Sequence, residues 1–176
     1  MTSNAPGADR ILGSLRSAEG TGIVRMEDRF PTTVDDLWSA LTDPRRLARW
    51  IADVEGDLRP GGDFGAHYLD GALEVRGHVD GCQPPQRLLL TMRDTDPHPG
   101  QPELTVIEAT LAADGDHTIL VVEERGLPLP LLPAYGAGVQ IHVENLAAHL
   151  SGGELAGEAR WQELIPAYRA LAPDAG

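Results

Sequence analysis

The central part of the chain alternates apolar and polar residues at the spacing of β-strands. In LEVRGHVD, Val75 and Val79 alternate with Arg76 and His78, so one face of this segment is apolar and the other polar. Similar short segments, rich in β-branched residues, are separated by turn sequences such as RPGG, DG, QPPQ and ADGD. Because such short turns join antiparallel neighbours, the pattern predicts an antiparallel meander with strands at 53–58, 63–69, 72–81, 87–94, 103–112 and 117–126.

The region before this meander predicts a strand followed by two short helices. Residues 22–31 show an imperfect alternation that indicates a strand, whereas ILGSLRS at 11–17 fits either a strand or a helical turn. Apolar residues then recur at helical spacing over 34–41, behind a threonine N-cap at Thr32 or Thr33. Pro44 ends that helix and begins the next.

The C-terminal part predicts a long amphipathic helix. Its apolar stripe runs over 137–151 and stops at SGG, and a shorter helical segment follows that is kinked or broken at Pro166. The proline-rich segment 127–133 is expected to be an irregular loop. Its leucines, at positions 127, 129, 131 and 132, are expected to be exposed or half-exposed, where they could gate a cavity or dock a protein partner.

Together these elements predict an α+β fold. A curved antiparallel sheet of about six or seven strands would carry two short helices after its first strand and a long C-terminal helix across it. We expect a disordered tail over 1–11 and one domain over 12–172. A curved sheet that holds one helix can leave a ligand cavity between them.

The composition of the chain argues against several classes of function. The formal net charge of −13 disfavours binding to a phosphate backbone, so we expect no nucleic-acid partner. Cys82 is the single cysteine, which excludes an intrachain disulfide and fits a reducing cytoplasm. No apolar run reaches the roughly 20 residues that cross a bilayer, so we expect no membrane insertion. All 14 basic residues are arginine, which is typical of a GC-rich genome.

Four stretches of the chain carry a resemblance to a known family. They are VDDLWSALTDPRRLARWI at 34–51, EGDLRPGGDF at 55–64, VDGCQPPQRLLLTM at 79–92 and VENLAAHLSG at 143–152. They resemble the bacterial proteins named after the activator of the heat-shock ATPase, within the START-like or SRPBCC superfamily. The resemblance covers roughly residues 12–171 and implies the helix-grip fold shared with the birch-pollen allergen Bet v 1.

This resemblance also implies classes of function. Members of the superfamily bind lipids, hormones and polyketides, and some are cyclases or aromatases. Some actinobacterial members protect a producer cell from its own enediyne antibiotic, in one case by being cleaved in its place. We therefore expect a non-enzymatic protein that sequesters an apolar small molecule, with antibiotic self-resistance as a specific version. A polyketide cyclase or aromatase and a chaperone-associated interaction module are the alternatives.

The candidate ligand contacts are the large side chains expected to face the space between sheet and helix. They are Trp50, Phe64, Tyr68, Met92, Tyr135, Val139, His142 and Leu146. For each of them, ordinary core packing is the competing interpretation. We assign no catalytic residue, metal site or cofactor.

Other reactive side chains give weaker signals. His142 and His149 lie seven residues apart on the long helix, but a zinc pair usually has four-residue spacing. Glu108, Glu123 and Glu124 could bring carboxylates together on adjacent strands, where arginine-paired surface charge is the expected role. Cys82 lacks a visible activating partner and is expected to be an inert, half-buried thiol.

Overall fold

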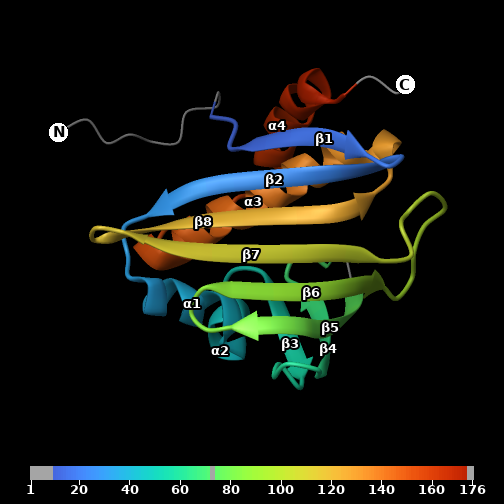
Figure 1. Ribbon diagram of the computed structural model, residues 1–176. Coiled ribbons are helices and arrows are strands. Elements are labelled where there is room, and N and C mark those ends of the chain that lie inside the picture. The colour runs from blue at the N-terminus through green and yellow to red at the C-terminus, as the bar shows by residue number, and fades with distance from the viewer. Residues whose placement is uncertain (1–9, 72–73, 174–176) are drawn as a thin grey trace.

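The protein is built around one large antiparallel sheet, seen in a computed structural model that describes residues 10–71 and 74–173 (Figure 1). Its strands, in the described part of the chain, are β1 (Gly13–Ala18), β2 (Thr21–Phe30), β3 (Ala52–Gly56), β4 (Asp63–Tyr68), β5 (Glu74–Gln83), β6 (Arg87–Asp94), β7 (Thr105–Asp114) and β8 (His117–Leu127). They lie in the order β1-β2-β8-β7-β6-β5-β4-β3. Residues 11–17, for which strand and helical turn were both open, thus supply the edge strand β1.

The helices are α1 (Val34–Thr42), α2 (Pro44–Leu47), α3 (Leu132–Ser151) and α4 (Glu158–Leu171), with a short 3-10 turn, η1 (Leu129–Leu131). The predicted cap of α1 is Thr33, whose hydroxyl accepts the Asp36 N–H. Asp43 ends α1 and caps α2, and Pro44 occupies the first turn of α2. Within the described residues, no helix has both the length and the apolar character to span a bilayer.

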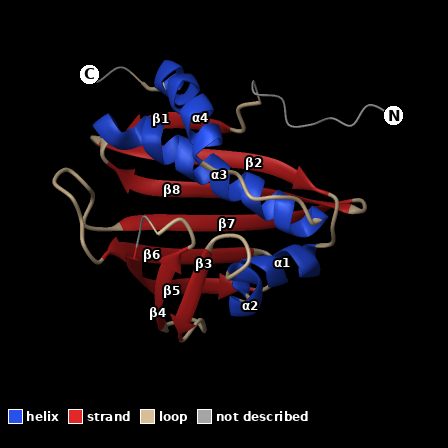
Figure 2. Cartoon of the chain, turned by 180° about the vertical axis from the view of Figure 1, so that it is seen from behind, coloured by secondary structure: helices blue, strands red, loops and turns tan. Residues whose placement is uncertain are grey.

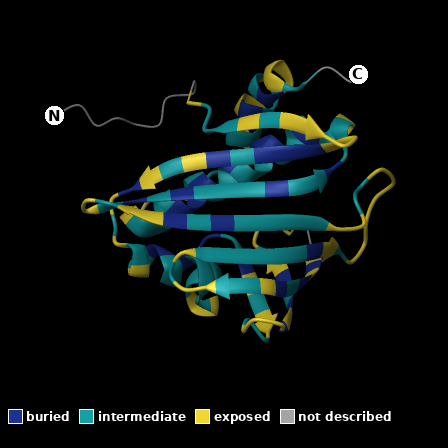
Figure 3. Cartoon of the chain, viewed as in Figure 1, coloured by how far each residue is buried: buried dark blue, intermediate teal, exposed yellow. Residues whose placement is uncertain are grey.

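Helix α3 lies across the sheet in the manner of a helix-grip fold. Figure 2 shows α3 crossing β2, β8 and β7, while α1 and α2 lie beside the other half of the sheet. Figure 3 shows buried positions on β2, β8 and β7, the strands that α3 crosses. Buried side chains of α3, including Val143 and Leu146, join Val24, Phe30 and Leu120 of the sheet in the main core. The α+β helix-grip architecture expected from the sequence is therefore present.

Two irregularities of the strands decide which side chains face α3. The β5–β6 register shifts between Val79 and Gly81, so that Cys82 comes to lie opposite Leu88. The β2–β8 register shifts near Gly126, which has a positive φ of 84°. Because of this second shift, Leu127 turns into the core.

The prediction for the segment 127–133 is therefore partly wrong. Leu127 and Leu132 are fully buried, and the Leu132 side chain lies against Gly22. Helix α3 begins at Leu132, earlier than the predicted 137, because Pro133 is tolerated in the first turn, where the N–H groups have no partner within the helix. Only Leu129 and Leu131 are half-buried, as expected.

For helix α4 the sequence left a kink and a break at Pro166 open, and the break is wrong, because the helix continues through the proline. The kink stays a prediction. Leu164 and Tyr168, on either side of the proline, are both fully buried. Their burial stabilises the helix despite the backbone hydrogen bond that proline removes.

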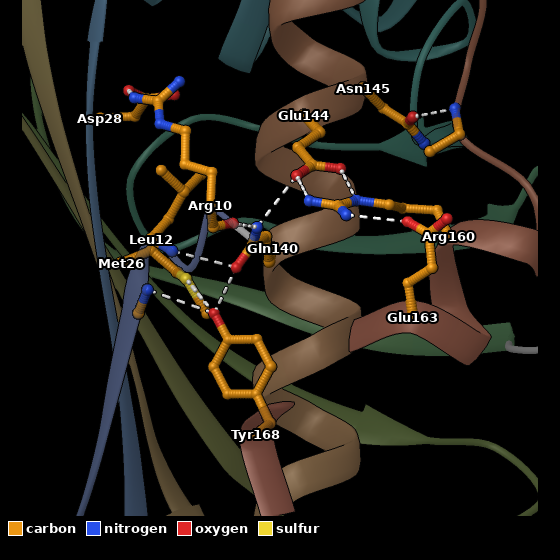
Figure 4. A network of polar contacts seen from close by, with 12 residues as sticks. Arg10, Leu12, Met26, Asp28, Gln140, Glu144, Asn145, Arg160, Glu163 and Tyr168 are labelled. Atoms are coloured by element: carbon orange, nitrogen blue, oxygen red, sulfur yellow. Dashed lines mark hydrogen bonds and ion pairs between the residues drawn. The ribbon is translucent and has the colours of Figure 1, made fainter. Parts of the chain in front are cut away.

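A polar network fastens the N-terminal residues and α4 to α3 (Figure 4). The buried Gln140 accepts the Leu12 N–H at 3.1 Å and the Tyr168 hydroxyl at 2.5 Å, and donates to the Arg10 carbonyl at 2.7 Å. The Tyr168 oxygen also accepts the Gly13 N–H at 3.2 Å. Residues 1–9 of the predicted tail lie outside the described residues, and the predicted single domain over 12–172 stays a prediction.

Candidate ligand-binding site

A cavity of about 610 Å³ lies between α3 and the inner face of the sheet. Its floor comes from β4 to β8, one end from α1, α2 and the residues after them, and its cover from α3. Side chains along the floor are mostly aliphatic, because alternate residues of each strand face inward: Leu88, Leu90 and Met92 from β6, Ile107 and Ala109 from β7, and Leu120 and Val122 from β8. A cavity of this size and lining suits an apolar small molecule.

All eight residues predicted from the sequence line this cavity. Trp50 and Leu146 lie deep, at 5% and 1% exposed, and the Trp50 indole donates to the Ala40 carbonyl at 3.0 Å. Phe64, Tyr68 and Met92 line it from the sheet, and Tyr135, Val139 and His142 from α3. The structure thus brings the set together, and their contact with a ligand stays a prediction.

Glu124, which the sequence analysis expects to be a surface charge paired with arginine, is instead a buried carboxyl that lines the cavity. In the sheet register, Glu108 and Glu123 lie opposite each other and face outward. There, Arg125 pairs with Glu123 at 3.0 Å and Arg87 pairs with Glu108. Glu124 points to the other face and is only 8% exposed. The expectation of arginine-paired surface charge therefore holds for two of the three glutamates.

Burial changes the protonation of Glu124. It raises the pKa of this carboxyl to about 7, and a hydrogen bond from the Thr105 side chain opposes the change only in part. A carboxyl with this pKa exchanges its proton near neutral pH, which makes it able to accept or donate one inside an otherwise apolar cavity.

His142 and the two tyrosines form the polar part of the α3 side of the cavity. The rings of Tyr68 and His142 are 5.4 Å apart between centroids and tilted by 32°. Burial lowers the pKa of His142 to about 4, so its imidazole is neutral at neutral pH. Burial also raises the pKa of Tyr135 to about 12 and shifts that of Tyr68 in the same direction, so both phenols keep their protons.

The remaining candidates for chemistry lie apart from this group. His149 does not line the cavity, and it accepts the Arg46 Nε–H at 3.2 Å. The two histidines of α3 therefore do not form a pair of metal ligands. Cys82 lines the cavity, and burial raises the pKa of its thiol, which weakens it as a nucleophile. Among the described residues, no group of three or more metal-ligating side chains is arranged around a common point.

Several proteins of solved structure have a fold similar to that of this chain. CalU16 from Micromonospora echinospora is 27% identical with a TM-score of 0.72, over 91% of this chain and 95% of its own. DynU16, a protein of the dynemicin biosynthetic locus, is 28% identical with a TM-score of 0.67, over 76% of this chain. The chain spans about half of DynU16, since 48% of that protein is covered. Protein MLL2253 from Mesorhizobium loti, at 24% identity and a TM-score of 0.66 over 76% of this chain and 99% of its own, supports the fold alone.

Sequence comparison agrees with the structural comparison. No curated protein has a sequence significantly similar to this chain. The family model described as "Activator of Hsp90 ATPase homolog 1-like protein" matches residues 31–151, which run from the end of β2 to the end of α3 and supply nearly all of the cavity wall. The chain therefore belongs to the family of activator of Hsp90 ATPase homolog 1-like proteins.

Proposed function

We propose that this protein is a cytoplasmic, non-catalytic carrier that sequesters an apolar small molecule, such as a lipid, a polyketide or an antibiotic natural product. The cavity of about 610 Å³ under α3 is the observation on which the proposal rests. Its aliphatic floor would bind by burying apolar surface, worth roughly 25 cal/mol per Å² before the cost of ordering the ligand. The Tyr68, His142 and Glu124 side chains would orient the bound molecule.

A specific version of this proposal is self-resistance to an enediyne-type antibiotic. It is supported by the similarity to DynU16, which comes from the dynemicin biosynthetic locus, and by the family resemblance. A stoichiometric amount of the protein would then protect plasmid DNA from cleavage by an activated enediyne. Unchanged DNA cleavage in the presence of excess protein would contradict this version but not the carrier itself.

Sequestration in the cavity is tested with two matched variants of β8. Val122 faces the cavity and its neighbour Val121 does not line it, so Val122→Trp fills the ligand space and Val121→Trp leaves it open. We expect isothermal titration of a panel of fatty acids, aromatic polyketides and an enediyne to give at least one ligand. Val122→Trp should weaken its binding by about tenfold or more, since it removes ligand space, and Val121→Trp should leave it unchanged. Equal binding by both variants would contradict sequestration in this cavity.

A cyclase or aromatase is the second candidate function, because Glu124 combines burial in the cavity with a pKa of about 7. In an aldol cyclisation, the Glu124 carboxylate would take a proton from a methylene group between two carbonyls. The resulting carbanion would attack a distant carbonyl of the same chain, and the new alkoxide would take up the proton. Mass spectrometry of a poly-β-ketone incubated with the protein separates the two functions: a carrier returns the compound unchanged, whereas an enzyme releases a cyclised product and loses this activity in Glu124→Gln.

A third candidate, a chaperone-associated interaction module acting through 127–133, loses much of its basis. Leu127 and Leu132 are buried, so two of the four leucines of this segment, Leu129 and Leu131, are partly exposed, and Leu131 lines the cavity. We propose this segment as part of the entrance instead.

A further inference from the structure

One end of the cavity is acidic. Asp70, after β4, and Asp94, at the end of β6, line the cavity together with Glu124 of β8. The electrostatic effect of Glu124 and Asp70 reaches the Tyr68 hydroxyl, and that of Glu124 and Asp94 reaches the Tyr135 hydroxyl. Glu124 therefore acts on both phenols and each aspartate on one of them, although the three carboxyl groups come from three different strand regions.

Glu124 is the buried member of this group. It lies directly opposite Val24 of β2 and Ile107 of β7, both apolar, and the Thr105 side chain is its hydrogen-bonding neighbour among the described residues. None of the ion pairs within the described residues includes Glu124. A carboxylate buried in apolar surroundings without a positive partner is unfavourable, and a cation that enters beside it relieves that cost.

The other polar groups at this end provide no buried positive charge. His142 is neutral at neutral pH, and Tyr68 and Tyr135 are neutral phenols. Arg93 also reaches the cavity wall, but it is exposed to solvent and belongs to none of the ion pairs found in the described residues. The aromatic faces of the tyrosines would themselves favour a cation that is shielded from water.

We propose that the ligand of this cavity is an apolar molecule that carries a basic amine, and that its ammonium group pairs with Glu124 between Tyr68 and Tyr135. This inference rests on the proposed binding function and narrows the class of ligand. The aliphatic floor would take the apolar body, and the acidic end would fix its direction. Asp70 and Asp94, nearer the surface, would add a longer-range attraction for the cation.

Binding of such a ligand depends on pH in a definite direction. Below pH 7, the free protein holds Glu124 protonated, so binding a cation must first release that proton. The affinity for an amine should therefore rise by roughly tenfold for each pH unit between about pH 5 and pH 7, and then level off. The affinity for a neutral ligand of the same shape should not rise with pH in this way.

Two compounds of equal size test the inference: 2-(1-naphthyl)ethylamine, whose amino group resembles that of lysine and is charged up to about pH 9, and 2-(1-naphthyl)ethanol, which is neutral. Dissociation constants are measured by titration calorimetry at pH 5.5 and pH 8 at moderate salt, for the wild type and two variants. Glu124→Gln removes the buried charge. Glu123→Gln is the matched control, because it removes a glutamate from the outer face of the same strand.

We expect the wild type to bind the amine at least about tenfold more tightly than the alcohol at pH 8, and to lose most of this preference at pH 5.5. Glu124→Gln should lose the preference at both pH values, and Glu123→Gln should keep it. Equal binding of the amine and the alcohol by the wild type would overturn the inference while leaving the carrier function intact. If neither compound bound, nor any of the apolar panel, the carrier function and the inference would both be overturned.

Discussion

Adjacent residues of β8 have opposite environments because successive side chains of a strand point to opposite faces. Glu123 is paired with Arg125 at 3.0 Å on the outer face, whereas Glu124 is 8% exposed on the inner face, among apolar neighbours. Burial raises the pKa of the Glu124 carboxyl to about 7, so this side chain changes its protonation near neutral pH. Glu124 is therefore the residue on which the proposed ligand selection by this cavity depends.

Glu124 should make the stability of the ligand-free protein depend on pH. Its pKa is about 7 in the folded state and near 4.5 when unfolded, so the unfolded state loses the proton first as pH rises from 4.5 to 7. This destabilises the folded protein progressively over that window, by roughly 3 kcal/mol at pH 8. We expect Glu124→Gln to unfold in urea with a free energy about 2–3 kcal/mol higher than the wild type at pH 8, and nearly equal at pH 4.5.

The same measurement on Glu123→Gln provides the control, since this substitution removes a partly exposed ion pair and should change stability by less than about 1 kcal/mol at either pH. A difference between Glu124→Gln and the wild type that is independent of pH would contradict the raised pKa of Glu124.

At the scale of single residues, the sequence predicts more of the cavity wall than of its chemistry. The large apolar and aromatic residues could be predicted because size and helical or strand spacing select them. The inward position of Glu124 could not be predicted. Alternate residues of ILVVEE form two sets, one with Glu123 and one with Glu124, and each set has two apolar residues, so either could face inward. Only the pairing register of β8 with β2 and β7 decides between them.

At the scale of elements, α3 acts as the cover of the cavity and is fastened from its outer side. Gln140 and Tyr168 connect α3 to the start of β1 and to α4, and Arg160 of α4 donates to Glu144 of α3 at 2.6 Å. Gly136 provides the space for the Tyr168 ring against α3. The family match ends at residue 151, so it includes α3 but not α4. Helix α4 therefore holds α3 in place from outside the matched region.

Removing the Tyr168 hydroxyl tests this connection. Tyr168→Phe keeps the buried ring but leaves Gln140 and the Gly13 N–H without this partner. We expect a loss of about 1–3 kcal/mol in the free energy of unfolding, measured by urea denaturation, because buried polar groups lose their hydrogen bonds. Unchanged stability would show that the network adds nothing to the attachment of α4.

The sequence predicts elements well where local chemistry decides them and poorly where distant contacts do. The start of α1 follows from a threonine cap, and the start of α2 from Asp43 and Pro44. The proline-rich sequence of 127–133 predicts an irregular loop with exposed or half-exposed leucines. Its actual conformation depends on the register shift near Gly126 and on the packing of Leu132 against Gly22, which no local pattern reveals.

At the scale of the whole molecule, the sheet and α3 enclose more space than their side chains fill. The strand and helix pattern predicts the helix-grip arrangement, but the same pattern is compatible with a fully packed core. The structure decides between them, because a cavity of about 610 Å³ lies between the sheet and α3, with α1 and α2 at one end. The carboxyl groups of Asp70, Asp94 and Glu124 make one end of the cavity acidic, so its two ends differ in polarity.

The central claim, that a small molecule binds inside this cavity, is tested most directly by intermolecular nuclear Overhauser effects between a bound compound and methyl-labelled protein. Leu90 and Val122 line the cavity, and their neighbours Leu89 and Val121 do not, so each pair contains its own control. Binding inside the cavity predicts Overhauser effects from the compound to the Leu90 and Val122 methyl groups and none to those of Leu89 and Val121. A compound that binds with the opposite pattern, or with contacts to neither inner residue, would contradict it.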